Sequence, residues 1–264
     1  MLATQPKPCY TLCMKTSLVR LLSTDNLRLD GLLFEPTTKT NKVVIHVHGT
    51  GGDFYRNIMI DFFAEQFTEI GYAFLTFNNR GSGENYEFFK IENGKISNRV
   101  EVGQDKEIFE ECIFDIQGAV DFAKSCGYTE IVLQGHSYGC NKIIYYTLKK
   151  SFVGGLVLLA PVDIHGIKLA KLANDQKSLD MFRYENQTLD PRLAKLQNKI
   201  IVQIGTADKY ILQKNKQDCL DYLGKAFPNT ELTGNIIANA THGYDFKYGE
   251  VAKNVANWLK GVSG

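Results

Sequence analysis

The fold is decided by residues 130–146, which read EIVLQGHSYGCNKIIYY. An apolar run typical of a β-strand, Glu130–Gln134, comes first, and an amphipathic helical run, Cys140–Tyr146, comes last. Between them stands Gly135-His136-Ser137-Tyr138-Gly139, a G-x-S-x-G pattern that needs glycine on both sides of a very tight turn. Strand, turn and helix in this order predict a nucleophile elbow, with the Ser137 hydroxyl exposed at the carboxyl edge of a sheet. A glycine–serine turn without chemistry is the alternative.

Outward from this stretch, strands alternate with helices. Apolar and polar periodicity predicts strands at Lys15–Leu22, Leu27–Phe34, Lys42–Val47, Tyr72–Phe77, Glu130–Gln134, Gly155–Leu159, Lys199–Ile204 and Glu231–Asn239. It predicts helices at Asn57–Ile70, Glu107–Ser125, Tyr138–Lys149, Gln213–Phe227 and Val251–Lys260. The first two strands form an antiparallel hairpin, so we expect an α/β fold: a mostly parallel, doubly wound sheet with an antiparallel start.

Two segments interrupt this alternation. Residues 84–106 are polar and rich in turn formers, with Tyr86 and Phe88 near their start. Residues 162–198 are helical and of mixed polarity, as expected for a small lid inserted into a single domain of residues 1–264. Since loops at the carboxyl ends of parallel strands form the reactive edge of the sheet, both segments are candidate substrate walls. The candidate wall residues are Tyr86, Phe88, Ile164 and Phe182, although the lid side chains could equally serve only to fasten short helices to the domain.

Composition restricts the partners. The chain has 264 residues, 44% of them hydrophobic, which suits one large α/β domain. Lys and Arg number 30 and Asp and Glu 29, so charge favours neither a nucleic acid nor a membrane surface as partner. The six cysteines are scattered, without C-x-x-C or metal-site spacing, and no signal-peptide or membrane-spanning segment is visible. We expect a cytoplasmic protein without metal or cofactor; the oligomeric state stays open.

Ser137 needs a general base, because an isolated alcohol is a poor nucleophile at neutral pH. Of the five histidines, His46 lies inside a strand, His48 opens a loop, and His136 is held in the elbow. His242 follows the last expected strand, in a loop that can reach back over the sheet. We therefore predict His242 as the base.

The base needs an acidic partner that fixes its tautomer. Asp208 follows the strand Lys199–Ile204, at a carboxyl end. The resulting order of Ser137, Asp208 and His242 is the one found in α/β-hydrolases. Asp163, after an earlier strand, is an alternative acid, whereas Asp245 is too close in sequence to His242 for the usual geometry.

An oxyanion hole requires two backbone N–H groups that point at the tetrahedral oxygen. Tyr138, which follows the nucleophile, would supply one. The loop after Lys42–Val47 reads His48-Gly49-Thr50-Gly51-Gly52, and by position Thr50 would supply the other. Gly49 permits close approach of the backbone to a substrate. A phosphate-binding loop is the rival interpretation, but no Gly-Lys-Ser/Thr follows.

Together these residues resemble the α/β-hydrolase superfamily from about Lys15 to the C-terminus. Asn79-Arg80-Gly81-Ser82-Gly83 is similar to the N-x-R-G-x-G loop of those enzymes, where its role is largely structural. Residues 133–146 and 160–163 are also loosely similar to the siderophore-esterase-like and feruloyl-esterase-like branches. The resemblance implies acyl transfer through Ser137, without a cofactor.

The leading expectation is therefore hydrolysis of a small-to-medium carboxylic ester. An amidase, a thioesterase, a C–C hydrolase or an acyltransferase would use the same three residues. A hydrolase-fold receptor that captures a small ligand without turnover belongs to a different class.

Overall fold

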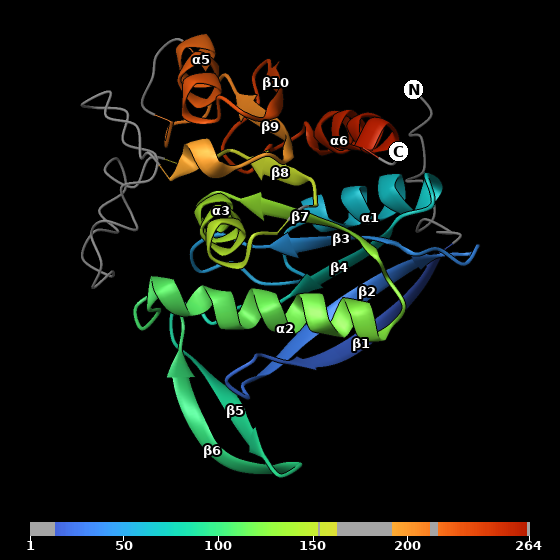
Figure 1. Ribbon diagram of the computed structural model, residues 1–264, viewed down its shortest axis with the longest axis vertical. Coiled ribbons are helices and arrows are strands. Elements are labelled where there is room, and N and C mark those ends of the chain that lie inside the picture. Colours follow the sequence, from blue (N-terminus) through green and yellow to red (C-terminus); the bar gives the residue numbers. More distant parts are fainter. Residues whose placement is uncertain (1–13, 153, 163–191, 212–215, 263–264) are drawn as a thin grey trace, which may run out of the picture.

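A central sheet of eight strands organises the chain (Figure 1). The computed structural model describes residues 14–152, 154–162, 192–211 and 216–262. In sheet order the strands are β1 (Met14–Leu22), β2 (Arg28–Pro36), β4 (Ala73–Phe77), β3 (Lys42–Val47), β7 (Glu130–His136), β8 (Leu156–Leu159), β9 (Lys199–Gly205) and β10 (Glu231–Ile237). β2 is antiparallel to both of its neighbours, and all other neighbouring strands are parallel. The expected α/β sheet with an antiparallel start is thereby confirmed.

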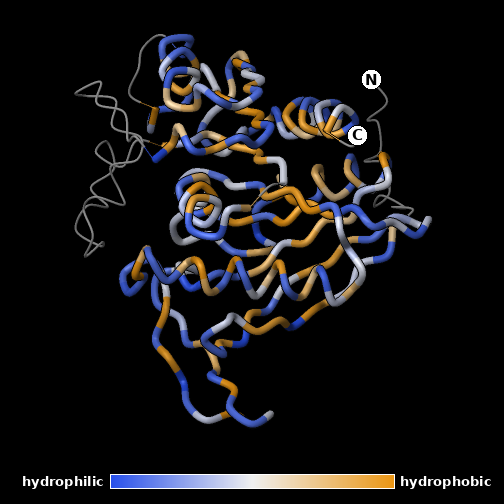
Figure 2. The backbone as a smooth tube through the Cα atoms, viewed as in Figure 1, coloured by the Kyte–Doolittle hydropathy of each residue, from blue (hydrophilic) through white to orange (hydrophobic). Residues whose placement is uncertain are grey.

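Helices cover both faces of this sheet. One face packs against α1 (Met59–Glu69) and α6 (Tyr248–Val262), and the other against α2 (Cys112–Ser125), α3 (Tyr138–Lys150) and α5 (Lys216–Ala226). Each face has its own apolar core, and Figure 2 shows hydrophobic residues concentrated along the central strands.

β3 illustrates why the sheet is buried on both sides. Successive side chains of a strand point to opposite faces. Val43 and Ile45 pack into the core beneath α2 and α3, whereas Val44, between them, packs into the core beneath α1 and α6. A continuous β-branched run is thus the pattern that a doubly covered parallel strand requires.

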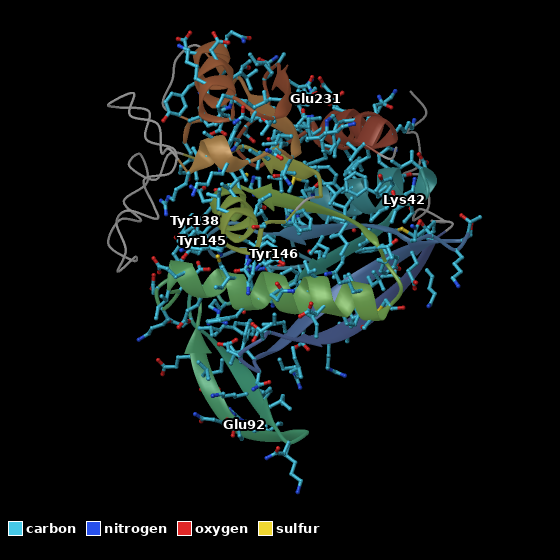
Figure 3. The ribbon with its side chains drawn as sticks, in the orientation of Figure 1. Lys42, Glu92, Tyr138, Tyr145, Tyr146 and Glu231 are labelled. Atoms are coloured by element: carbon cyan, nitrogen blue, oxygen red, sulfur yellow. The ribbon has the colours of Figure 1, made fainter. Side chains whose placement is uncertain are left out.

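Residues 84–106, polar and rich in turn formers, contain regular secondary structure that was not predicted. They form a separate antiparallel hairpin of β5 (Tyr86–Glu92) and β6 (Lys95–Val102), which extends away from the main sheet (Figure 1). Glu92 marks its far end in Figure 3. Asn93 and Gly94 both adopt positive φ, 51° and 73°. Asn-Gly with two positive φ angles is the preferred two-residue hairpin turn, so the sequence carried a signal for this element.

The other expected elements agree with the structure, with ends displaced by a few residues. Most of the expected lid lies outside the described residues, including Ile164 and Phe182, so the lid and the single-domain organisation stay predictions. A short 3₁₀ helix, Leu193–Lys195, follows, and Leu193 is fully buried. In the described part of the chain, no helix is long and apolar enough to cross a membrane.

Candidate active site

Ser137 lies in the sharp turn that joins β7 to α3. Its backbone has φ 54° and ψ −125°, a conformation that non-glycine residues rarely adopt and that is characteristic of functional sites. Its N–H donates to the Leu159 carbonyl at 2.8 Å, which ties the turn to the neighbouring strand β8. α3 begins at the next residue, so Ser137 stands at the positive end of a helix dipole.

The flanking glycines let the helix approach the sheet. A Cβ on Gly139 would lie 2.1 Å from the Val47 carbonyl oxygen in β3, and one on Gly135 would lie 2.5 Å from the Cys140 nitrogen. Neither distance is compatible with a side chain. The turn therefore depends on both glycines of the pattern.

His242 is held by Asp208. The two side chains meet at 2.8 Å between His242 Nδ1 and Asp208 Oδ2, and the Asp208 side chain is fully buried. Asp208 Oδ1 accepts the Tyr210 N–H at 2.8 Å, which fixes the carboxylate. Of the competing acids, Asp245 instead accepts hydrogen bonds from Thr241 Oγ1 and the Tyr248 hydroxyl, and Asp163 lies outside the described residues.

A cavity of about 200 Å³ is lined by four of the predicted site residues: Ser137, His242, Gly49 and Thr50. It lies at the carboxyl ends of β3 and β7. Its described lining consists of His46, His48, Gly49, Thr50, Gly52, Asp53, Asn57, His136, Ser137 and His242. Tyr138 contributes no side chain to it; its ring packs 5.4 Å from that of Phe109, and its backbone opens α3.

Two predicted substrate walls are absent from the described lining of this cavity. The Phe88 side chain is buried in the core beneath α2. Tyr86 is 54% exposed and borders a different hollow at the base of the β5–β6 hairpin. Neither side chain therefore lines the described cavity beside Ser137, and the segment that carries them folds as a hairpin.

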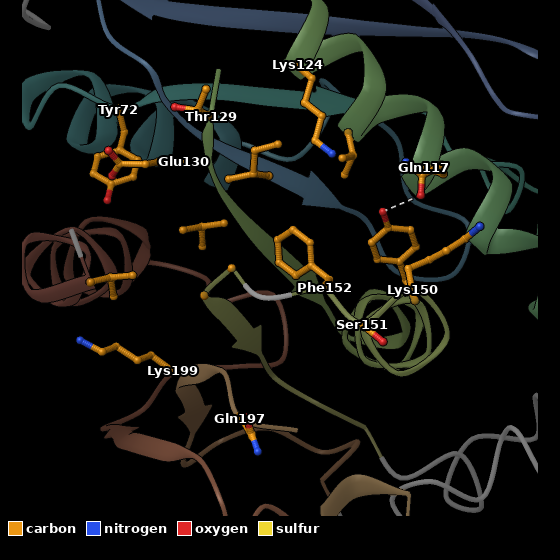
Figure 4. A pocket seen from close by; sticks show the side chains of 17 residues that line it. Tyr72, Gln117, Lys124, Thr129, Glu130, Lys150, Ser151, Phe152, Gln197 and Lys199 are labelled. Carbon is orange, nitrogen blue, oxygen red and sulfur yellow. Dashed lines mark hydrogen bonds between the residues drawn. The ribbon is translucent and has the colours of Figure 1, made fainter. Parts of the chain in front are cut away.

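A second cavity, about 700 Å³, is larger than the one beside Ser137 (Figure 4). It is bordered by Glu130, Ile131 and Val132 at the start of β7, at the opposite end of the strand from the elbow. Size alone therefore does not locate the chemistry.

The loop expected to form the oxyanion hole lies against Ser137. A Cβ on Gly49 would lie 2.9 Å from Ser137 Cβ, so only glycine fits there. Backbone hydrogen bonds join this loop to residues 79–83: the Gly51 N–H donates to the Gly81 carbonyl at 3.1 Å, and the Gly83 N–H to the Gly52 carbonyl at 3.3 Å. The Asn79–Gly83 segment thus braces the loop.

Arg80 fixes the Asn79–Gly83 segment through ion pairs. Its guanidinium, 4% exposed, donates to Asp115 Oδ1 at 2.8 Å and also pairs with Asp25 and Glu111. The structural role expected for this residue agrees with its position, since these partners join the loop to α2 and to the β1–β2 turn.

Three further histidines line the cavity, and sequence reasoning had given none of them a role in the site. His48 Nδ1 donates to the Gly49 carbonyl at 2.8 Å, and its Nε2 accepts the Asn79 N–H at 3.2 Å, so the ring is neutral. Burial, and next the charge of Lys142, lower the pKa of His48 to about 3. His46 Nδ1 accepts from the Gln134 side chain at 3.0 Å, and burial holds its pKa well below the usual value.

His136 touches the base itself. Its Nε2 donates to the backbone carbonyl of His242 at 2.8 Å, and the two rings lie 5.1 Å apart. Burial, and next the proximity of His242, lower the pKa of His136 to about 4. A neutral His136 therefore fixes the backbone of the loop that carries the base.

No group of three or more His, Cys, Asp or Glu side chains is arranged to hold a metal ion within the ranges that the structure describes. The four described cysteines, Cys112, Cys126, Cys140 and Cys219, are free thiols.

The fold and the strand-end position of Ser137 are those of the α/β-hydrolase fold, and solved structures agree. The chain is similar to Est1E from Butyrivibrio proteoclasticus with ferulic acid bound, at 18% identity over 92% of this chain and 98% of that one, with a TM-score of 0.67. It is similar to the Pyrococcus furiosus esterase Pf2001, at 19% identity over 96% and 95% of the two chains, with a TM-score of 0.65.

A third similar structure is XC6422 from Xanthomonas campestris, described as an α/β serine hydrolase without a lid, at 14% identity over 95% and 96% of the chains and a TM-score of 0.63. No protein-family model and no curated protein sequence matches the chain. At these identities the likeness establishes the fold and leaves the substrate to be argued from the site.

Proposed function

We propose that the protein is a carboxylic-ester hydrolase that forms an acyl-enzyme on Ser137. The observation that carries this proposal is the geometry of His242: it shares a cavity with Ser137, and Asp208 binds its Nδ1 at 2.8 Å. That contact leaves Nε2 as the nitrogen available to take a proton from the serine. The similarity to solved esterases supports the same class of reaction.

In the proposed acylation step, Ser137 Oγ attacks the ester carbonyl carbon while His242 Nε2 accepts the hydroxyl proton. The backbone N–H groups of Thr50 and Tyr138 donate to the resulting oxyanion. His242 then returns its proton to the departing alkoxide, which leaves as an alcohol. Asp208 stabilises the imidazolium throughout.

Deacylation repeats these steps with water. A water molecule loses its proton to His242 and attacks the acyl carbonyl, and the second oxyanion uses the same two N–H groups. Collapse of that intermediate returns the proton from His242 to Ser137 Oγ and releases the carboxylic acid.

The described cavity favours a small-to-medium acyl group. Its volume is about 200 Å³, and Asp53 and Asn57 add polar groups to its wall. Since a similar structure holds ferulic acid, a hydroxycinnamate ester belongs among the substrates to be tested.

A fluorophosphonate probe and a series of p-nitrophenyl esters test the proposal. We expect the wild type to be labelled and to hydrolyse the short and medium chains, and Ser137→Ala to lose both properties. Ser125→Ala, which alters an exposed serine at the end of α2, is the matched control and should behave as the wild type.

The same panel separates the alternatives. A folded wild type that is not labelled and hydrolyses no ester would contradict the proposal and favour a ligand-binding protein. Faster turnover of matched anilides or thioesters than of esters would instead indicate an amidase or a thioesterase with the same three residues.

A further inference from the structure

Lys142 is a buried cation close to the candidate nucleophile. It lies in α3, five residues after Ser137, and its side chain is 0% exposed. Its Nζ lies 2.5 Å from Glu107 Oε1 and donates to Asn79 Oδ1 at 2.9 Å. Removing an ammonium group from water is costly, and a buried ion pair is weak evidence for stability alone. This pair therefore calls for another explanation.

Asn79 connects Lys142 to the loop that precedes Thr50. Its backbone N–H donates to His48 Nε2 at 3.2 Å, and its Nδ2 donates to the His48 carbonyl at 3.3 Å. Its Oδ1 accepts from Lys142 and from the Gly81 N–H at 3.0 Å. Both ends of the side-chain amide are thus used, and Lys142 helps to fix which end faces His48.

His48 passes this constraint on. Its Nδ1 donates to the Gly49 carbonyl at 2.8 Å, and that carbonyl belongs to the peptide unit whose nitrogen is Thr50 N. An unbroken series of polar contacts therefore runs from Glu107 through Lys142, Asn79 and His48 to the peptide that bears the candidate oxyanion donor.

Glu107 contacts the Asn79–Gly83 segment directly, at Gly81. A Cβ on Gly81 would lie 2.3 Å from Glu107 Oε2, so the carboxylate packs directly against the Gly81 backbone. The carbonyl of Gly81 in turn accepts the Gly51 N–H at 3.1 Å. The ion pair thus contacts residues 79–83, which are hydrogen-bonded to the candidate oxyanion loop at residues 48–52.

We infer that Lys142, paired with Glu107, is a positioning residue that sets the Thr50 N–H of the oxyanion hole through Asn79 and His48. The expected effect on kcat rests on the proposed function, whereas the expected effect on the position of the loop does not. Oxyanion donors must be held to within about 0.5 Å to stabilise the developing charge, which a loop rich in glycine does not achieve unaided.

Lys142→Met tests the inference, with Lys149→Met as the matched control. Lys149 lies in the same helix over a tyrosine ring, as Lys142 does, but it is solvent-exposed. We expect Lys142→Met to lower kcat for a p-nitrophenyl ester about 10- to 100-fold with KM changed less than about twofold, since loss of a whole oxyanion donor costs about 10²–10³. Lys149→Met should match the wild type.

A double variant separates positioning from folding. Lys142→Met alone leaves Glu107 buried without its partner and lowers stability, whereas Lys142→Met/Glu107→Met replaces the whole pair by apolar side chains and should recover the midpoint of thermal unfolding. We expect the double variant to keep the low kcat. Recovery of wild-type kcat together with stability would overturn the inference.

Amide hydrogen exchange supplies a readout that needs no turnover. Peptides covering residues 48–52 and 79–83 should exchange faster in Lys142→Met and in the double variant than in the wild type or Lys149→Met. Unchanged exchange in these loops would overturn the inference. If the wild type hydrolyses no ester, the proposed function fails, and the exchange result still decides whether Lys142 positions the loop.

Discussion

A single methyl group at Gly49 would reach the candidate nucleophile. Its Cβ would lie 2.9 Å from both the Ser137 Cβ and the His136 carbonyl oxygen. We expect Gly49→Ala to displace the loop and to lower kcat/KM for p-nitrophenyl acetate by about 10²-fold or more, comparable to loss of an oxyanion donor. Stopped-flow or steady-state assays with a thermal melt would measure both activity and fold.

Gly224→Ala is the control for this substitution. Gly224 lies within α5, and nothing lies within 4 Å of a Cβ placed on it. Alanine in a helix interior is favoured over glycine by about 0.5–1 kcal/mol, so this variant should be slightly more stable and fully active. Equal activity of Gly49→Ala and Gly224→Ala would contradict the assignment of the loop.

A single substitution also tests Asp208 as the acidic partner of His242. Asp208→Asn retains the size of the side chain but permits the wrong tautomer of His242, so kcat should fall about 10³- to 10⁴-fold in steady-state assays. Asp245→Asn should change kcat less than about twofold, because Asp245 binds Thr241 and Tyr248 rather than His242. A comparable loss in Asp163→Asn, with Asp208→Asn active, would transfer the role to Asp163.

Among the elements, the β5–β6 hairpin carries two aromatic residues, Phe88 and Tyr86, that should affect stability differently when they are replaced. Phe88 is 5% exposed and packs into the core, whereas Tyr86 is 54% exposed. We expect Phe88→Ala to lower the free energy of unfolding by about 3–5 kcal/mol, measured by chemical denaturation, and Tyr86→Ala by less than about 0.5 kcal/mol. Neither should alter KM for short esters by more than about twofold. A large rise in KM for Tyr86→Ala would instead support the prediction that Tyr86 contacts the substrate.

The sequence predicted most elements because their patterns are local. β3 is a near-continuous β-branched run, and the elbow shows strand, glycine turn and helix within seventeen residues. The β5–β6 hairpin was not predicted, because its strands are largely exposed and their apolar and polar residues do not alternate strongly. Only the Asn93-Gly94 turn indicated it. Lys142 could not be predicted as part of the site: in an amphipathic helix a lysine normally marks the solvated face, and its burial depends on Glu107 and Asn79 from distant segments.

At the scale of the whole molecule, neutral buried histidines link stability to pH. His48 and His136 have pKa values of about 3 and 4 in the folded protein, and burial lowers that of His46 as well. In the unfolded chain these groups take up protons near pH 6.5. The unfolded state therefore binds more protons as the pH falls below about 6.5, and the free energy of unfolding must decrease there.

The size of this effect can be measured. Between pH 7 and pH 5, His48 and His136 should each lower the free energy of unfolding by about 2 kcal/mol, as measured by urea denaturation at both pH values. His136→Gln removes one titrating group and should reduce the difference between the two pH values by about that amount. An unchanged difference in this variant would show that His136 is protonated in the folded protein near its usual pKa.

The parallel pairing of β3 with β7 also bears on the order of events during synthesis. These central strands place Lys42 beside Glu130, so the middle of the sheet cannot close until the first half of the chain has left the ribosome. Asp208 follows on β9, and His242 comes after β10, both later along the chain. Parallel pairing over such separations is slow because a long loop must be ordered first. We therefore expect a nascent chain to pair β3 with β7 before it can react with a serine-directed probe, because that reaction also needs Asp208 and His242, which follow β9 and β10.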